Sequence, residues 1–159
     1  MFLYGMLNRA IRMLDMEVMT KLDFFIRRLH LQLEKLHQKK STNFQKPFTV
    51  YRCQGLSKHA FQDLLDSKGG LLSFNSFLST STNRETVTAF VQHVSQKNTD
   101  TVAVIFIMTI DSSKISTSIT PFAMIDEQSA IPSEQEILFT MHTVFRIGEI
   151  KRTAKDGRL

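Results

Sequence analysis

The sequence predicts the α+β fold class, with an N-terminal helical segment followed mostly by strands. Two patterns along the 159 residues carry this prediction. Before residue 40, apolar residues recur every three or four positions, which is the period of an α-helix. After residue 47 the period falls to two, in short runs separated by Gly, Pro and hydroxyl residues, which is typical of strands and turns. Helices followed by strands with two small helices indicate α+β.

The helical segment spans residues 1–46. Apolar residues form one stripe along it, which consists of Leu7, Ile11, Leu14, Val18, Leu22, Phe25, Leu29, Leu33 and Leu36. Charged residues such as Arg12, Lys21 and Glu34 lie between these positions. The average spacing of the stripe residues is nearer 3.6 than 3.5, which disfavours a coiled coil. The stripe is expected to be core or to dock on the rest of the chain. The polar run closed by Pro47 reads as a linker, so the second region is 47–159.

The second region alternates strands with short helices. We expect, in order, a strand at 48–53, a helix that Ser57 caps, a turn at Gly69-Gly70, two short strands or one broken strand in LLSF and NSFLSTS, a helix that Thr82 or Asn83 caps, a strand at 101–110, and strands at 136–140 and 143–152. The run TVAVIFIMTI is apolar on both faces and therefore predicts a central, buried strand. Only two residues follow the turn signal Asp156-Gly157, which predicts either a last strand that ends early and leaves an open edge or a truncated C-terminal strand.

Charge and composition limit the possible partners. The net charge is +5, and residues 1–47 hold nine Lys and Arg against four Asp and Glu, whereas residues 48–159 hold eleven of each. A balanced second region without bases interleaved with aromatics predicts no nucleic-acid partner. No apolar run reaches the roughly 20 residues of a membrane span, so no membrane partner is expected. The single cysteine, Cys53, allows no intrachain disulfide, and no metal-ligand spacing is present. A single cysteine fits a reducing compartment, so we expect a cytoplasmic protein. Because no metal-ligand spacing is present, we expect no bound metal.

Arg52 is the first candidate site residue. A charged side chain inside a strand costs desolvation energy unless it is paired. It is either a structural arginine in a salt bridge or a clamp for phosphate or carboxylate, which suits the guanidinium fork. When Arg52 is considered alone, the structural and the functional interpretation are equally favoured.

Two further motifs combine polar groups with strand ends. The run Ser79-Thr80-Ser81 leads into a helix, where helix capping is the simple interpretation. Glu134 and Glu136 open a strand two positions apart, which would place both carboxylates on one face beside an apolar wall. Such a pair suits acid–base or cation-stabilising chemistry, although an exposed loop end would tolerate it as well.

Taken in order, the three motifs resemble the arginine–serine–glutamate class of mono-ADP-ribosyltransferases, the family of clostridial-type toxins and vertebrate ecto-enzymes. The matching stretches are YRCQG, FLSTS and SEQEILF, and the resemblance spans about residues 48–150. It implies a mixed two-sheet β core with an NAD-binding cleft between the sheets. No glycine-rich phosphate loop of the usual type is present, so the NAD expectation rests on the resemblance.

The resemblance also implies roles for individual residues. Arg52 would bind NAD, Ser79 would orient Glu136, and Glu136 would stabilise the cationic sugar as nicotinamide leaves. Glu134 would engage the acceptor, and a glutamate there goes with arginine side chains of proteins. The remaining expected NAD-binding residues are Tyr51, Gln54, Gly55, Thr80, Ser81 and Phe90. For Phe90, a place in the core is an equally good interpretation.

The resemblance therefore predicts transfer of ADP-ribose from NAD to protein arginines. Two other functions stay open: hydrolysis of NAD with water as the acceptor, and a degenerate module that binds NAD or a protein. Cys53 stands where the family often has glycine, which favours degeneration, whereas intact Arg52, Ser79 and Glu136 oppose it. Similar chains place a long helix beside helical repeats, so residues 1–46 are a candidate docking surface for a helical partner or repeat domain.

Overall fold

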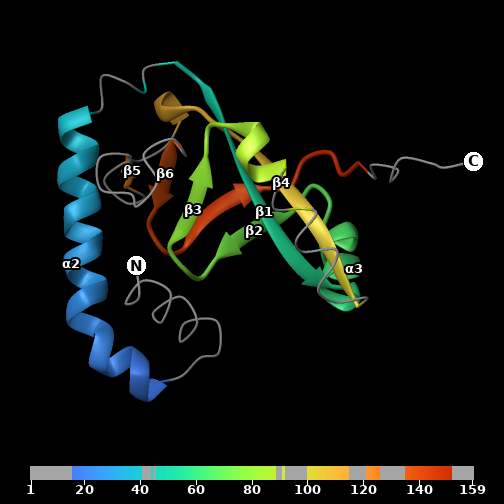
Figure 1. Ribbon diagram of the computed structural model, residues 1–159, viewed down its shortest axis with the longest axis horizontal. Helices are drawn as coiled ribbons and strands as arrows, with labels where there is room; N and C mark the ends of the chain where they lie inside the picture. The colour runs from blue at the N-terminus through green and yellow to red at the C-terminus, as the bar shows by residue number, and fades with distance from the viewer. Residues whose placement is uncertain are drawn as a thin grey trace, which may run out of the picture.

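The computed structural model describes residues 16–40, 44, 46–88, 91, 100–114, 121–125 and 135–151 (Figure 1). Its elements, in chain order, are α2 (Met16–Lys40), β1 (Phe48–Ser57), α3 (Lys58–Asp66), β2 (Leu71–Phe74), β3 (Leu78–Ser81), β4 (Thr101–Ile110), the 3₁₀ turn η2 (Ser112–Lys114), β5 (Phe122–Met124), β6 (Glu136–Phe139) and β7 (Thr143–Arg146). A long helix followed by two sheets confirms the α+β prediction. The predicted turn at Asp156-Gly157 lies outside the described residues.

The strands form two sheets. The larger has the order β4-β1-β3-β6-β5 and the smaller pairs β2 with β7. Each pairing of neighbouring strands within the two sheets is antiparallel. The stretches LLSF and NSFLSTS therefore form two strands in different sheets, and the chain changes sheet between Phe74 and Leu78. That change of sheet matters for the site, because β2 leaves the layer that carries β1 and β3.

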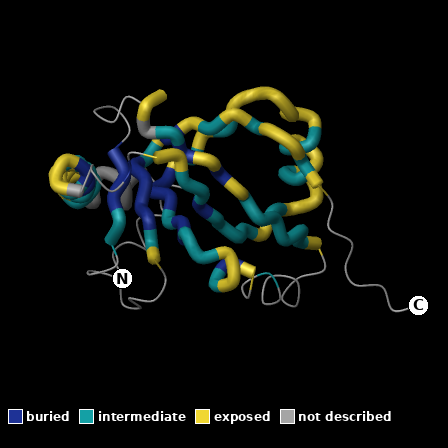
Figure 2. The backbone as a smooth tube through the Cα atoms, turned by 90° about the horizontal axis from the view of Figure 1, so that it is seen from above, coloured by how far each residue is buried: buried dark blue, intermediate teal, exposed yellow. Residues whose placement is uncertain are grey.

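Strand β6 shows how the core divides around the larger sheet. Its residues alternate between faces. Ile137 and Phe139 belong to a cluster with Val50 and Phe122, whereas Leu138 belongs to a second cluster with Leu33 of α2. All three β6 side chains are buried, which explains why the run Ile-Leu-Phe is apolar without alternation. Figure 2 shows the buried residues gathered in the strands beside α2.

Helix α2 packs its apolar stripe on β5 and β6. Leu33 is 1% exposed, and Phe25, Leu29 and Leu36 pack around the same cluster. Two histidines add polar anchors: His37 Nδ1 lies 2.8 Å from the carbonyl oxygen of Phe122, and His30 Nδ1 lies 2.8 Å from Thr140 Oγ1. The predicted amphipathic helix is thus confirmed for Met16–Lys40, and Phe25, Leu29, Leu33 and Leu36 of its stripe belong to the core. The predicted stripe residues Leu7, Ile11, Leu14, Val18 and Leu22 lie outside the residues whose side chains are described.

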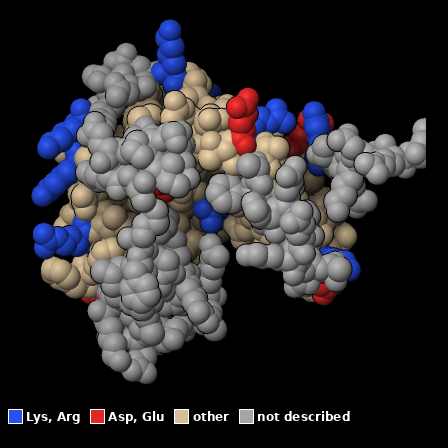
Figure 3. All heavy atoms as spheres, viewed as in Figure 1, with Lys and Arg blue, Asp and Glu red and all other residues tan. Residues whose placement is uncertain are grey.

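The outer face of α2 is basic. Its exposed residues include Arg27, Arg28, Lys35 and Lys39, and the side of the molecule on which α2 lies shows protruding Lys and Arg side chains (Figure 3). Within the described residues, no helix is long and apolar enough to cross a membrane.

Strand β4 corrects one prediction. Thr101–Ile110 forms a strand with the expected bounds, but it lies at the end of its sheet and pairs with β1 along its whole length. Ile107 is 59% exposed, and burial alternates from Ile107 to Ile110. The prediction of a central, buried strand was therefore wrong, because an apolar run does not reveal how many neighbours a strand has.

The cap of α3 and the turn that follows this helix were predicted correctly. Ser57 is the N-cap, since its hydroxyl oxygen accepts a hydrogen bond from Ala60 N at 3.1 Å. Gly69 adopts φ 82°, a conformation that favours glycine, and turns the chain into β2. The first strand extends beyond the predicted end at residue 53, as far as Ser57, whereas β7 ends at Arg146 rather than at residue 152. These differences concern only the ends of elements.

Candidate active site

The centre of the candidate site is the bond between Ser79 and Glu136. Ser79 lies in β3 and Glu136 is the first residue of β6; the register pairs Ser79 with Leu138 and Ser81 with Glu136, which makes Ser79 and Glu136 diagonal neighbours. Ser79 Oγ donates a hydrogen bond to Glu136 Oε1 at 2.5 Å. Short O–H···O contacts of this kind are typical of charge-assisted bonds. The carboxylate is therefore oriented by the serine.

Arg52 binds the same serine through the backbone carbonyl of Ser79. Arg52 Nη1 donates a hydrogen bond to the carbonyl oxygen of Ser79 at 2.7 Å. Strand β1 pairs with β3 through Tyr51 and Ser81, so the guanidinium crosses to the neighbouring strand. Ser79 uses its carbonyl for Arg52 and its hydroxyl for Glu136. Three strands that are distant in sequence thus bring together three of the four predicted catalytic residues.

The other hydroxyls of the run Ser79-Thr80-Ser81 hold the backbone. Thr80 Oγ1 donates to the carbonyl oxygen of Ile137 at 2.8 Å, and Thr80 is buried. Ser81 Oγ accepts from Asn83 N at 3.0 Å, and Asn83 Oδ1 in turn accepts from Glu85 N at 2.9 Å. Asn83 is thus the cap of the helical turn at residues 84–88. The hydroxyl run therefore combines one site residue with two structural ones.

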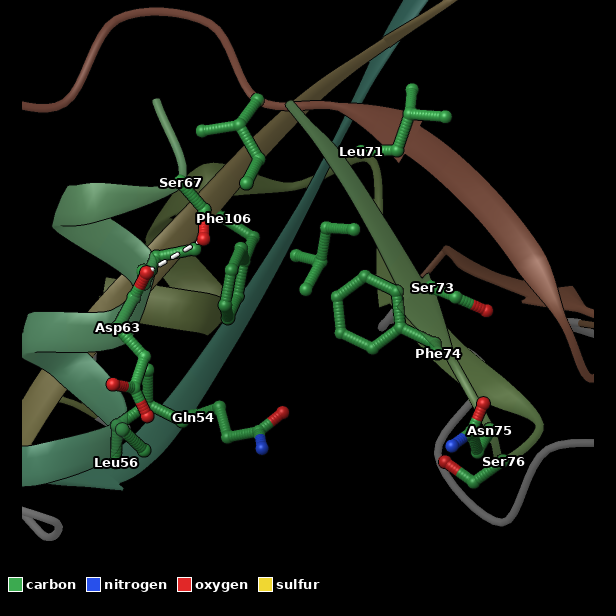
Figure 4. A pocket seen from close by; sticks show the side chains of 14 residues that line it. Gln54, Leu56, Asp63, Ser67, Leu71, Ser73, Phe74, Asn75, Ser76 and Phe106 are labelled. Atoms are coloured by element: carbon green, nitrogen blue, oxygen red, sulfur yellow. Dashed lines mark hydrogen bonds between the residues drawn. The ribbon is translucent and has the colours of Figure 1, made fainter. Parts of the chain in front are cut away.

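A cleft of about 360 Å³ opens between the two sheets, and Arg52, Ser79 and Glu136 are not among the residues that line it. Its walls come from β1 and α3 on one side and from β2 on the other (Figure 4). Gln54 and Leu56 line it, and Arg52 shares their face of β1 because alternate residues of a strand point to the same side. The residues Asn75 and Ser76, which connect β2 to β3, line it as well.

Two aromatic rings give the cleft an apolar interior. Phe74 of β2 and Phe106 of β4 both line it, with ring centroids 5.5 Å apart at an interplanar angle of 84°. Gln54 extends from β1 into the space in front of them (Figure 4). A concave site with apolar rings and a few polar groups is what a flat heterocyclic ligand needs. No residue of α2 is part of this lining, so among the described residues the helix completes the core and does not border the cleft.

Cys53 and Tyr51 face away from this arrangement. Both occupy the alternate positions of β1, opposite to Arg52 and Gln54. Burial raises the pKa of the Cys53 thiol, and the positive charge of Arg52 opposes that shift only partly. The thiol is therefore held in its neutral form and does not point to the face that carries Arg52. The strand geometry therefore does not support the interpretation of Cys53 as a sign of a degenerate site.

The remaining predicted residues divide into three groups. The structure brings Arg52, Ser79 and Glu136 together and places Gln54 in the cleft. It does not bring Tyr51 or Gly55 into the cleft lining, and it engages Thr80 and Ser81 with the protein backbone. Glu134 and Phe90 lie outside the residues whose side chains are described. Within the described residues, no group of three potential metal ligands occurs.

The geometry before β6 differs from the predicted extended strand. Gln135 has φ 45°, which is left-handed, and the strand begins only at Glu136. The i, i+2 rule that placed Glu134 and Glu136 on one face requires extended backbone between them. That reasoning therefore fails at Gln135. Sequence reasoning also missed Phe74 and Phe106; for Phe74 the signal was the interleaving of rings and hydroxyls in SFNSF, whereas Phe106 lies in the apolar run TVAVIFIMTI, where nothing singles it out.

Comparison with known structures identifies the fold. The ADP-ribosyltransferase Vis, in complex with the inhibitor M6, matches at 25% identity with a TM-score of 0.69. The Vis toxin of Vibrio splendidus, also an ADP-ribosyltransferase, matches at 25% identity with a TM-score of 0.64. Each match covers 95% of this chain but 62% of the Vis chain, so this chain spans less than two thirds of the neighbour's length. No protein-family model and no curated protein sequence matches. The chain has the fold of ADP-ribosyltransferases, as the sequence motifs predicted.

Proposed function

We propose that this chain transfers ADP-ribose from NAD to arginine side chains of proteins and releases nicotinamide. The observation that carries the proposal is the linked cluster in which Arg52 binds the carbonyl of Ser79 while the Ser79 hydroxyl binds Glu136. Fold and motif order point to the same chemistry. The cleft lined by Gln54, which shares the face of β1 with Arg52, has the size and the apolar rings that a nucleotide base requires.

NAD is the substrate whose glycosidic bond breaks. The bond between C1′ of the ribose and the nicotinamide nitrogen breaks, and its electron pair leaves with nicotinamide, which becomes neutral. The sugar is left with positive charge at C1′. A carboxylate close to that centre stabilises it, as in glycoside cleavage. Glu136 takes this role, and Ser79 holds its carboxylate in a fixed direction before the charge develops.

Arg52 is suited to the negative part of the substrate. Its guanidinium keeps its charge at any physiological pH and offers several donors in a planar fork. One of these donors holds the β3 carbonyl of Ser79. A diphosphate bound between β1 and β2 would meet the cation on the face of β1 that also carries Gln54. The adenine ring would then lie against Phe74 and Phe106.

The acceptor is proposed to be a guanidinium group. Its nitrogen attacks C1′, the new C–N bond forms, and one proton leaves the guanidinium. Glu134 would bind the guanidinium and take up that proton, because a carboxylate pairs well with a planar cation. This assignment rests on the resemblance of SEQEILF to the motif of arginine-specific ADP-ribosyltransferases. Proteins with an accessible arginine are therefore the proposed partners.

Hydrolysis of NAD is the second candidate. Arg52, Ser79 and Glu136 address the NAD side of the reaction, and water needs no further recognition. The described cluster by itself therefore supports cleavage, while acceptor choice depends on residues beyond it.

The test is transfer of label from NAD to agmatine, a small guanidine, with cadaverine as an amine of similar length. Labelled agmatine without labelled cadaverine is the expected result. Nicotinamide release with neither product labelled would replace the transferase by the hydrolase. A folded protein that binds NAD without releasing nicotinamide would contradict both functions.

A further inference from the structure

Gln135 adopts a backbone conformation that needs an explanation. Among the described residues, positive φ outside glycine occurs at Gln135, at 45°, and at His142, at 61°. His142 lies in the turn between β6 and β7, and its N–H donates to the carbonyl oxygen of Phe74 at 2.9 Å. Gln135 instead stands directly before the proposed catalytic carboxylate. A left-handed residue other than glycine costs free energy and persists where its surroundings impose it.

The contacts that impose it come from Thr82. Thr82 N donates to the carbonyl oxygen of Gln135 at 3.2 Å. Thr82 Oγ1 also donates to Gln135 Oε1 at 2.7 Å. The regular β3–β6 ladder ends at the pair Ser81 and Glu136, so these two bonds continue the contact one residue beyond the ladder. They tie the backbone and the side chain of Gln135 to the same partner.

Glu136 is thereby held from three directions. Its backbone pairs with Ser81 on β3, and its carbonyl oxygen accepts from Ile125 N at 3.0 Å. Gln135 precedes it and is fixed by Thr82. The end of a strand otherwise frays, and a shift of Glu136 there would lengthen its bond to Ser79. The rigid start of β6 is therefore a requirement for the direction of the carboxylate.

We propose that Thr82 is a positioning residue that acts through Gln135 to keep the Glu136 carboxylate on Ser79. This inference rests on the proposed NAD-cleaving function. A purely structural role would be a contribution to the start of the helical turn at residues 84–88. However, the described cap of that turn is Asn83, whereas the described bonds of Thr82 go to Gln135. The side-chain bond lies at the surface, so its effect on activity should be moderate rather than complete.

The experiment compares Thr82→Val, Thr82→Ser, Gln135→Ala and the double variant Thr82→Val/Gln135→Ala. The rate of nicotinamide release is measured over a range of NAD concentrations, which gives kcat and KM separately. Thr82→Val is isosteric and removes only the hydroxyl. We expect it to lower kcat about tenfold and to leave KM within about twofold, because the carboxylate acts mainly in the transition state. Thr82→Ser keeps the hydroxyl and should restore kcat.

The double variant tests whether the effect passes through Gln135. If it does, the kcat of the double variant should lie within about twofold of the kcat of Gln135→Ala, because the effects of coupled residues are not additive. Gln135→Ala alone should reproduce the loss seen for Thr82→Val. It therefore carries the test by itself if the valine variant does not fold.

Three results would overturn the inference. One is a valine variant with a lower melting temperature and an unchanged kcat. The second is an equal loss in the presence and absence of the Gln135 side chain, and the third is a serine variant that fails to restore kcat. A wild-type chain that does not cleave NAD contradicts the proposed function, and the inference falls with it. A wild-type chain that cleaves NAD, with variants of equal kcat, contradicts the inference alone.

Discussion

The Ser79→Ala substitution separates the two bonds of Ser79. Alanine lacks the hydroxyl but keeps the backbone carbonyl, so the 2.7 Å contact from Arg52 Nη1 survives while the 2.5 Å bond to Glu136 Oε1 is lost. A hydrogen bond to a charged group contributes about 1.5–3 kcal/mol. If the lost bond acts in the transition state, kcat falls roughly ten- to a hundredfold. Since Ser79 is half-buried, we expect a value near the lower end of that range.

The assay is the initial rate of nicotinamide release at a series of NAD concentrations. The KM for NAD should stay within about twofold, because the hydroxyl orients the carboxylate and does not hold the substrate. Ser113→Ala is the matched control, since it deletes the hydroxyl of an exposed serine that bonds to Asp111, away from the cleft. A Ser79→Ala variant with the kcat of this control would refute the reasoning. A raised KM with an unchanged kcat would show that the hydroxyl binds NAD instead.

Three further predictions concern the clamp, the core and the thiol. Arg52→Lys keeps the charge but loses the planar fork, so the KM for NAD should rise about tenfold; an unchanged KM would mean that Arg52 only supports Ser79. Leu33→Ala, at a side chain 1% exposed between α2 and the sheet, should lower the free energy of unfolding in urea by about 2–5 kcal/mol; a loss too small to measure would mean that α2 is not part of the core. The Cys53 pKa is raised by burial, so alkylation of the folded protein should need a higher pH than alkylation of the unfolded chain, because the thiolate is the reactive form; equal pH profiles would contradict the burial of this thiol.

The sequence predicted the local elements because their signals are local. Ser57 as a helix cap and Gly69 in a turn follow from the chemistry of single residues. The stripe that includes Leu29, Leu33 and Leu36 follows from the helical period and was confirmed by its contacts. The class of the fold follows from the order of such elements.

The place of each strand in its sheet could not be predicted in the same way. The run Thr101–Ile110 is apolar throughout, and apolarity alone cannot distinguish a central strand from an end strand with one covered face. Likewise, the separation of Phe74 and Leu78 into two sheets depends on partners distant in sequence. The cleft lies at that separation, so its rings could not be assigned from the sequence.

The sequence indicated that Arg52, Ser79 and Glu136 belong together, but not how the backbone around them is held. The order of Arg52, Ser79 and Glu136 along the chain suggested one site, and the hydrogen bonds join them. The left-handed Gln135 and its bonds to Thr82 carried no sequence signal, since neither glycine nor asparagine marks the position. The alternation rule applied to Glu134 and Glu136 failed for this reason.

The most direct test of the central claim is nicotinamide release from NAD by the wild-type chain and by Glu136→Gln. Glutamine keeps the size of the side chain and removes its charge. We predict release by the wild type and a loss of at least about a hundredfold in the variant, because a charge aimed at the reacting centre is removed. Glu149→Gln, at an exposed glutamate that pairs with Lys151, should release nicotinamide at the wild-type rate. Equal rates for Glu136→Gln and the wild type would contradict the account, because the cluster around Ser79 would then not be the catalytic site.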